Sequence, residues 1–110
     1  MNAHPAVPEN PRLDFDAMQR KAADAVSLLK GLANESRLMI VCVLSEGELS
    51  VGQLNRRIEL SQSALSQHLA VLREQGLVQT RRESQTIFYR LADSAAIDII
   101  RLLHAAYCEA

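Results

Sequence analysis

The sequence predicts a mainly α-helical fold with a small β-hairpin wing, in the order helix, helix, helix, helix, strand, strand, helix. This is the layout of a winged helix-turn-helix. Apolar residues recur every three or four positions, capping residues precede the helical stretches, and the period changes to alternation after Gly76. We expect residues 14–110 to form one domain, preceded by a proline-containing flexible leader over residues 1–13.

The first two predicted helices lie before residue 47. An apolar stripe that begins at Phe15 predicts a helix from Asp14 or Asp16 to Leu32, with Gly31 near its end. Asn34 is a good N-cap for a second helix from Glu35, and Gly47 suits the turn that follows it. Cys42 falls on or beside the apolar side of this second helix.

Two more helices follow with clear start signals. Ser50 and Gln53 form a capping box, which predicts a helix to about Ile58. Ser61 is the expected cap of the next helix, which should end near Gly76. Two capped helices joined by about three residues are typical of a helix-turn-helix.

The alternating stretch predicts strands over residues 78–82 and 86–91, joined by a polar tip at residues 83–85. A last helix is expected over residues 93–109. It is apolar around most of its circumference, and a chain of 110 residues has little to cover it with. We therefore expect a partner subunit to cover it.

The outward face of the fourth helix carries the side chains expected to read DNA bases. They are small, hydroxyl-bearing or amide-bearing, or basic: Gln62, Ser63, Ser66, Gln67 and Arg73. Arg81 and Arg82 on the wing are expected to meet phosphate or the minor groove. Residues 50–91 carry six Arg and three Glu, whereas the rest of the chain is net acidic. The basic charge is thus gathered in the predicted reading module.

Composition excludes several other classes of protein. The sequence has no signal-peptide pattern and no apolar run long enough to cross a membrane, so we expect a cytoplasmic protein with reduced thiols. It has no Gly-rich phosphate loop, nucleophile elbow or paired carboxylates, so an enzyme is not expected. A winged-helix module for protein interaction, without DNA readout, remains an alternative.

Three stretches, "LKGLANESRLMIVCVLSEGELSVGQL", "LSQSALSQHLAVLREQGLV" and "RRESQTIFYRL", resemble the ArsR/SmtB family of winged-helix repressors over residues 16–108. The resemblance implies a homodimer held by its first and last helices. It also implies binding to double-stranded operator DNA at an imperfect inverted repeat, and release of the DNA when an inducer binds.

Many members of that family sense metals, and the family's ligand positions are changed in this chain. Ser50 and Gly52 stand where the family's thiolate ligands occur, and Ala95 and Ala106 stand where its zinc-binding histidines occur. No metal or other cofactor is therefore expected. A three-ligand site from Cys42, His104 and Cys108 remains a weaker alternative, in which the chain would be a metal-sensing repressor.

The two cysteines can be interpreted in two ways. Their spacing alone favours packing roles, with Cys42 as a small core residue and Cys108 near a fraying end. The resemblance instead points to the subgroup of sulfide- and persulfide-responsive repressors called BigR and SqrR, and the chain is also similar to the HlyU regulators, which carry the same two cysteines. In that subgroup a reactive sulfur species is the inducer, and the resemblance implies a disulfide or polysulfide link between Cys42 and Cys108 that switches off operator binding.

Overall fold

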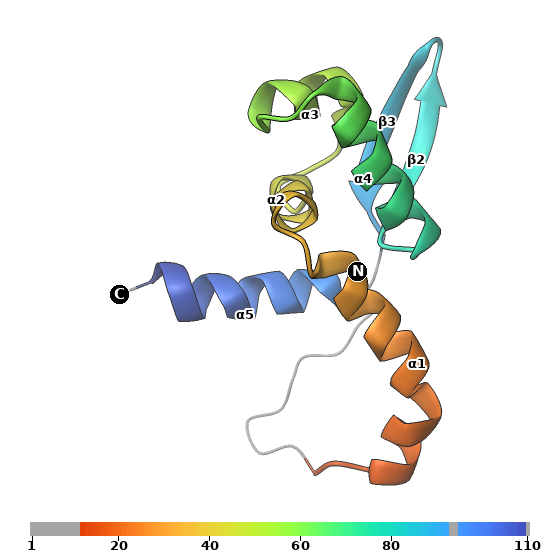
Figure 1. The fold of residues 1–110 in the computed structure, drawn as a ribbon, viewed down its shortest axis with the longest axis vertical. Helices are drawn as coiled ribbons and strands as arrows, with labels where there is room; N and C mark the ends of the chain where they lie inside the picture. Colours follow the sequence, from red (N-terminus) through yellow and green to blue (C-terminus); the bar gives the residue numbers. More distant parts are fainter. Residues whose placement is uncertain (1–11, 93–94, 110) are drawn as a thin grey trace.

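The computed structural model describes residues 12–92 and 95–109, and it confirms the predicted winged-helix architecture (Figure 1). In chain order the elements are α1 (Phe15–Leu32), α2 (Glu35–Leu44), β1 (Leu49–Ser50), α3 (Val51–Arg57), α4 (Gln62–Glu74), β2 (Val78–Glu83), β3 (Thr86–Leu91) and α5 (Ala96–Cys108). Most of the predicted leader lies outside the described residues, as does Asp93, the expected start of the last helix.

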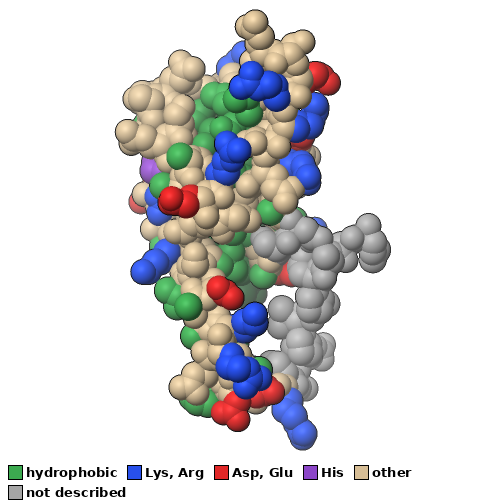
Figure 2. All heavy atoms as spheres, turned by 90° about the vertical axis from the view of Figure 1, so that its right-hand side faces the viewer, with side chains coloured by type: hydrophobic (Ala, Val, Ile, Leu, Met, Phe, Trp, Pro, Cys, Tyr) green, Lys and Arg blue, Asp and Glu red, His purple; other side chains and the backbone are tan. Residues whose placement is uncertain are grey.

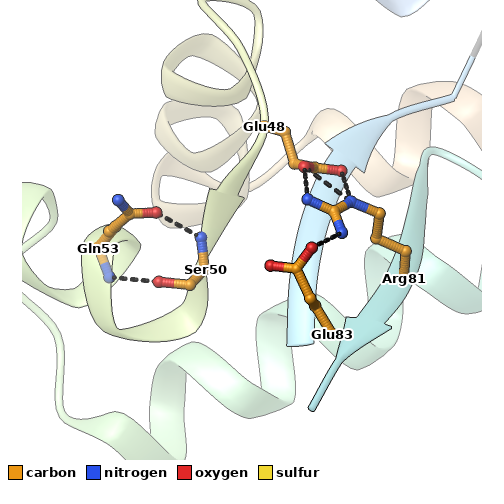
Figure 3. Close-up of polar contacts among 5 residues, drawn as sticks. All are labelled: Glu48, Ser50, Gln53, Arg81 and Glu83. Atoms are coloured by element: carbon orange, nitrogen blue, oxygen red, sulfur yellow. Dashed lines mark hydrogen bonds and ion pairs between the residues drawn. The ribbon is translucent and has the colours of Figure 1, made fainter. Parts of the chain in front are cut away.

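Three of the five helices begin at the predicted caps, and α1 begins after Asp14, one of its two predicted starts. Each capping side chain accepts a hydrogen bond from the backbone N–H three residues later, at 3.0 Å for Asp14 and Asn34, 3.2 Å for Ser50 and 3.1 Å for Ser61. The capping box of α3 is complete, because Gln53 Oε1 also accepts from the Ser50 N–H at 2.8 Å (Figure 3). These bonds satisfy donors that a helix start otherwise leaves unpaired.

The sheet has three antiparallel strands in the order β1-β3-β2, one more than predicted. The additional strand, β1, is only two residues long and therefore shows no alternation that could reveal it. The hairpin tip is also shorter than expected. Glu83 pairs with Thr86, which leaves Ser84 and Gln85 as the turn, and Ser84 takes a positive φ of 56°. Two-residue turns with positive φ match the twist of the flanking strands.

The core lies where α2, α3 and α4 meet the base of the hairpin. As predicted, one face of α4 is buried, and its leucines pack with apolar residues of the other elements; the fully buried side chains are Ile40, Val41, Leu54, Leu65, Leu69 and Leu72. α2 packs against α1, α3, α4, α5 and β3, so it is the central helix of the fold.

The first and last helices, α1 and α5, extend away from this core (Figure 1). Ala96 and Ile100 of α5 are buried, whereas Leu102 and Tyr107 are 68% and 83% exposed. Phe15 on α1 is 76% exposed. Within the described residues, no helix combines the length and apolar character needed to cross a bilayer.

Gly31 lies near the end of α1, as predicted, and the structure places it at a close packing contact. A Cβ at this position would lie 2.6 Å from Leu77 Cδ1, and Leu77 is buried. At Gly52 in α3, the nearest atom to an added Cβ is Ser50 Oγ, 4.0 Å away. The two helical glycines therefore have very different surroundings.

Gly31→Ala and Gly52→Ala should differ in their effect on stability. Alanine favours a helix by about 1 kcal/mol over glycine, whereas overpacking costs about 1–3 kcal/mol. We expect Gly52→Ala to raise the free energy of unfolding. The free energy of unfolding of Gly31→Ala should lie at least about 1 kcal/mol below that of Gly52→Ala, as measured in urea titrations. Equal stabilities of the two variants would contradict the packing contact.

Candidate nucleic-acid interface and thiol groove

The exposed face of α4 carries the predicted base-reading side chains. Leu65, Leu69 and Leu72 hold the opposite face in the core. The predicted DNA-facing residues of this helix are all exposed: Gln62, Ser63, Ser66, Gln67 and Arg73. The turn before α4 is held by Asn55, whose Nδ2 donates to the Leu60 carbonyl oxygen at 2.8 Å. α4 thus presents a polar, close-approach surface of the kind that reads base edges in a major groove.

The two wing arginines lie on opposite faces of the hairpin. Successive strand residues alternate between faces, so Arg82 shares a face with Thr80 and Arg81 shares a face with its cross-strand partner Phe88. Arg82 is exposed and forms no ion pair within the part of the chain that the structure describes. Its guanidinium is therefore available to a phosphate.

Arg81, in contrast, is held by two carboxylates (Figure 3) and by the ring of Phe88. Its Nε lies 3.0 Å from both carboxylate oxygens of Glu48, its Nη2 lies 2.8 Å from one of them, and its Nη1 lies 3.4 Å from Glu83. The guanidinium carbon sits 4.5 Å from the centroid of Phe88. The hydrogen bond to Glu48 raises the pKa of Arg81 above its ordinary value. This clamp ties β2 to the segment that leads into β1.

Sequence reasoning missed the Glu48 clamp because its partners are 33 positions apart. The only local signal is that Glu48 directly precedes Leu49, the first residue of β1, and β1 itself can be recognised only from its pairing with β3.

Figure 2 shows the side of the molecule that carries the wing, and basic side chains gather over the end where the wing lies. Along α1, at the other end, acidic and basic side chains are mixed.

A second candidate site lies between α2 and α5, where both cysteines line the same groove. The groove has a volume of about 310 Å³, and its walls are almost wholly apolar: Leu38, Met39, Cys42, Ile100, Leu103, His104, Tyr107 and Cys108. Both thiols are free, with Cys42 half-buried and Cys108 exposed. Two cysteines that are distant in the sequence therefore line one groove.

A polar hollow of about 280 Å³ adjoins this groove. Cys42, Ile100 and His104 line both, and the polar hollow adds Glu46, Arg101 and Glu109, together with Ser45. His104 Nδ1 lies 3.4 Å from Glu109 Oε2. The Ser45 hydroxyl donates to the Cys42 carbonyl oxygen at 2.6 Å. Three residues are thus shared by an almost wholly apolar groove and a hollow lined by charged side chains.

Among the described residues, no three His, Cys, Asp or Glu side chains lie close enough together to hold a metal ion. Cys42, His104 and Cys108 share a groove, yet they do not form such a cluster. Ser50, at one of the family's thiolate positions, uses its hydroxyl to cap α3.

Comparisons with known proteins agree with this geometry. Residues 34–80 match the family described as bacterial regulatory protein, arsR family. The transcriptional activator HlyU of Vibrio cholerae is 55% identical over 98 residues, which cover 89% of this chain and 91% of that protein. The crystal structure of the transcriptional repressor BigR from Xylella fastidiosa has a TM-score of 0.81 against this chain, with 44% identity and coverage of 87% of this chain and 98% of that one.

A more distant solution structure bears on assembly. It is the winged helix-turn-helix domain of a possible ArsR-family regulator from Mycobacterium bovis, which is described as homodimeric. It has a TM-score of 0.72, 28% identity and coverage of 89% of both chains.

The Arg81 clamp predicts a measurable difference between the two wing arginines. Charge-assisted bonds to a carboxylate should slow exchange of the Arg81 Nε–H with water relative to that of Arg82. In Glu48→Gln the Arg81 proton should exchange at a rate close to that of Arg82, as read from ¹H–¹⁵N spectra. If Glu48→Gln leaves the Arg81 exchange rate unchanged, Glu48 does not hold this side chain in solution.

Proposed function

The chain belongs to the ArsR family of bacterial transcriptional regulators, and on this basis we propose that a sulfur link between Cys42 and Cys108 switches its binding to DNA. The family resemblance read from the sequence is confirmed, and the relatives are DNA-binding regulators rather than enzymes. The single observation that carries the proposed switch is the groove between α2 and α5, which both thiols line.

The DNA-binding part of the proposal assigns base readout to α4 and phosphate contacts to the wing. Gln62 and Gln67 can pair with adenine, and Ser63 and Ser66 are short enough to allow a close approach to the groove. Arg73 is the basic member of this base-reading set, because an arginine can pair with guanine, and Arg82 and Arg81 are the phosphate contacts. Arg81 must exchange Glu48 for the phosphate, so its net contribution is smaller than that of Arg82.

We further propose that the protein acts as a homodimer through α1 and α5. Both helices expose large apolar side chains, which favours burial against a second copy: Phe15, Met18, Val26, Leu29, Leu102 and Tyr107. A two-fold axis presents two α4 helices to successive major grooves, about 34 Å apart. The matching operator is an imperfect inverted repeat in double-stranded DNA.

The inducer in this proposal is a reactive sulfur species, a persulfide or polysulfide. Each cysteine thiolate displaces one terminal thiolate from a donor R–S–Sn–S–R, so two thiolates leave and the internal sulfurs form the bridge. The donor is reduced and the two thiols are oxidised. No metal or other cofactor takes part.

The bridge acts on DNA binding through the position of α5. Cys42 lies on the central helix α2, and Cys108 lies at the end of the helix proposed to hold the dimer. A covalent link between them changes the angle of α5 and hence the spacing of the two α4 helices. A hundredfold loss of DNA affinity requires the bridged protein to disfavour the DNA-bound arrangement by only about 2.7 kcal/mol.

The wing assignment predicts a specific salt dependence. With a DNA site selected from a random pool, Arg82→Ala should make the slope of log K against log[salt] shallower by about 0.9 for each phosphate that the variant no longer neutralises. Arg81→Ala should change the slope less. Arg20→Ala on α1 removes the same charge far from the proposed DNA surface and should leave the slope unchanged. A slope unaffected by Arg82→Ala would remove Arg82 from the interface.

The switch predicts that polysulfide releases the wild-type protein from the selected DNA site, with a fall in DNA affinity of about a hundredfold, equivalent to the preference given above. Cys42→Ser and Cys108→Ser should bind DNA normally when reduced and should not respond to polysulfide. Fluorescence anisotropy measures the affinity, and mass spectrometry of the treated wild type identifies the bridge. Persistence of the response in both serine variants would rule out the proposed link.

A further inference from the structure

We propose that His104 is the proton acceptor of the sulfur switch, taking the proton of a cysteine thiol as its sulfur attacks the donor. This inference rests on the proposed function, because it names the group that makes the same two thiols reactive. The nucleophile in thiol–disulfide chemistry is the thiolate, so a thiol in an apolar groove needs a place for its proton.

The lining of the groove limits the choice of acceptor. Besides the two cysteines, only His104 and Tyr107 among its lining residues carry titratable groups. A phenol holds its own proton at neutral pH, whereas a neutral imidazole accepts one. Other charged groups face His104 from the adjoining hollow, namely Glu46, which follows α2, and Arg101 and Glu109 of the α5 end.

His104 also shares the groove with both thiols and contacts a carboxylate. It lines both hollows together with Cys42, and it precedes Cys108 by one helical turn on α5. Its Nδ1 faces Glu109 at 3.4 Å. A proton on Nδ1 that points to this carboxylate leaves the Nε2 lone pair as the acceptor, and the carboxylate stabilises the imidazolium that forms.

The proton balance of the reaction then closes on His104. Cys42 Sγ attacks the sulfur of Sn that is bonded to one terminal RS group of R–S–Sn–S–R, and the Cys42 proton moves to Nε2. The bond between that sulfur and the RS group breaks, and RS⁻ leaves. The imidazolium gives that proton to RS⁻ and is neutral again. Cys108 repeats the step at the other end of the donor. Two thiols and the donor yield the bridge and two RSH, with His104 unchanged.

The test measures the rate of bridge formation from about pH 6 to pH 10 with glutathione trisulfide, by acid quench and mass spectrometry of the full-length protein. General-base assistance contributes about 10²–10⁴-fold at best, and less at an open site. We therefore expect His104→Gln to react about tenfold or more slowly than wild type at neutral pH. The two rates should converge above about pH 9, where a free thiol ionises without help.

Two further variants sharpen the result. Tyr107→Phe should match wild type at every pH, whereas Glu109→Gln should lose part of the rate at neutral pH. DNA binding by reduced His104→Gln should be unchanged, which shows that the variant is folded. Equal rates for His104→Gln and wild type at neutral pH would overturn the role of His104 and leave the switch intact. A slower rate for His104→Gln with the same pH dependence as wild type would have the same two consequences. If wild type forms no bridge, the proposed function itself fails.

Discussion

The burial of one leucine face of α4 is the constraint on which the rest of the molecule depends. Leu65, Leu69 and Leu72 are essentially inaccessible to solvent, and they fix the rotation of the helix about its own axis. That rotation decides which side chains point outward, because a helix that buries one stripe must present the opposite one. A turn of the helix by one position would bring Ser66 into the core and a leucine to the DNA. The exposed face proposed to read DNA is thus a consequence of core packing.

Local signals explain how much of this fold can be predicted from the sequence. Helix starts are encoded within four residues, as Ser50 and Gln53 illustrate, and the buried face of α4 follows from its period. Long-range pairing is not encoded in this way. The strand at Leu49 exists only because β3 lies beside it, and the partner of Arg81 comes from a distant segment. The elements are therefore predictable from local patterns, whereas the contacts between them are not.

The thiol groove illustrates the same division. From the residues alone, a packing role is the better explanation of Cys42, and only a family resemblance joins it to Cys108. The fold gives a physical basis for considering the two together, since α5 packs against α2 and both cysteines line one groove. α2 contacts every other helix and β3, so the proposed change in the angle of α5 would take place against the same helix that supports α4. The groove and α4 are thus both built on α2.

The carboxylates around Arg81 also bear on how the protein searches a genome. Glu48 and Glu83 lower the positive potential of the wing when no DNA is bound. Attraction to DNA of any sequence depends on that potential, and a genome offers on the order of 10⁶–10⁹ competing sites. Every sequence offers the same phosphates, so in the proposed interface Arg81 gives up Glu48 on any DNA and adds no sequence preference. The clamp therefore weakens the general attraction of the wing to DNA, and sequence choice is left to the side chains proposed for α4.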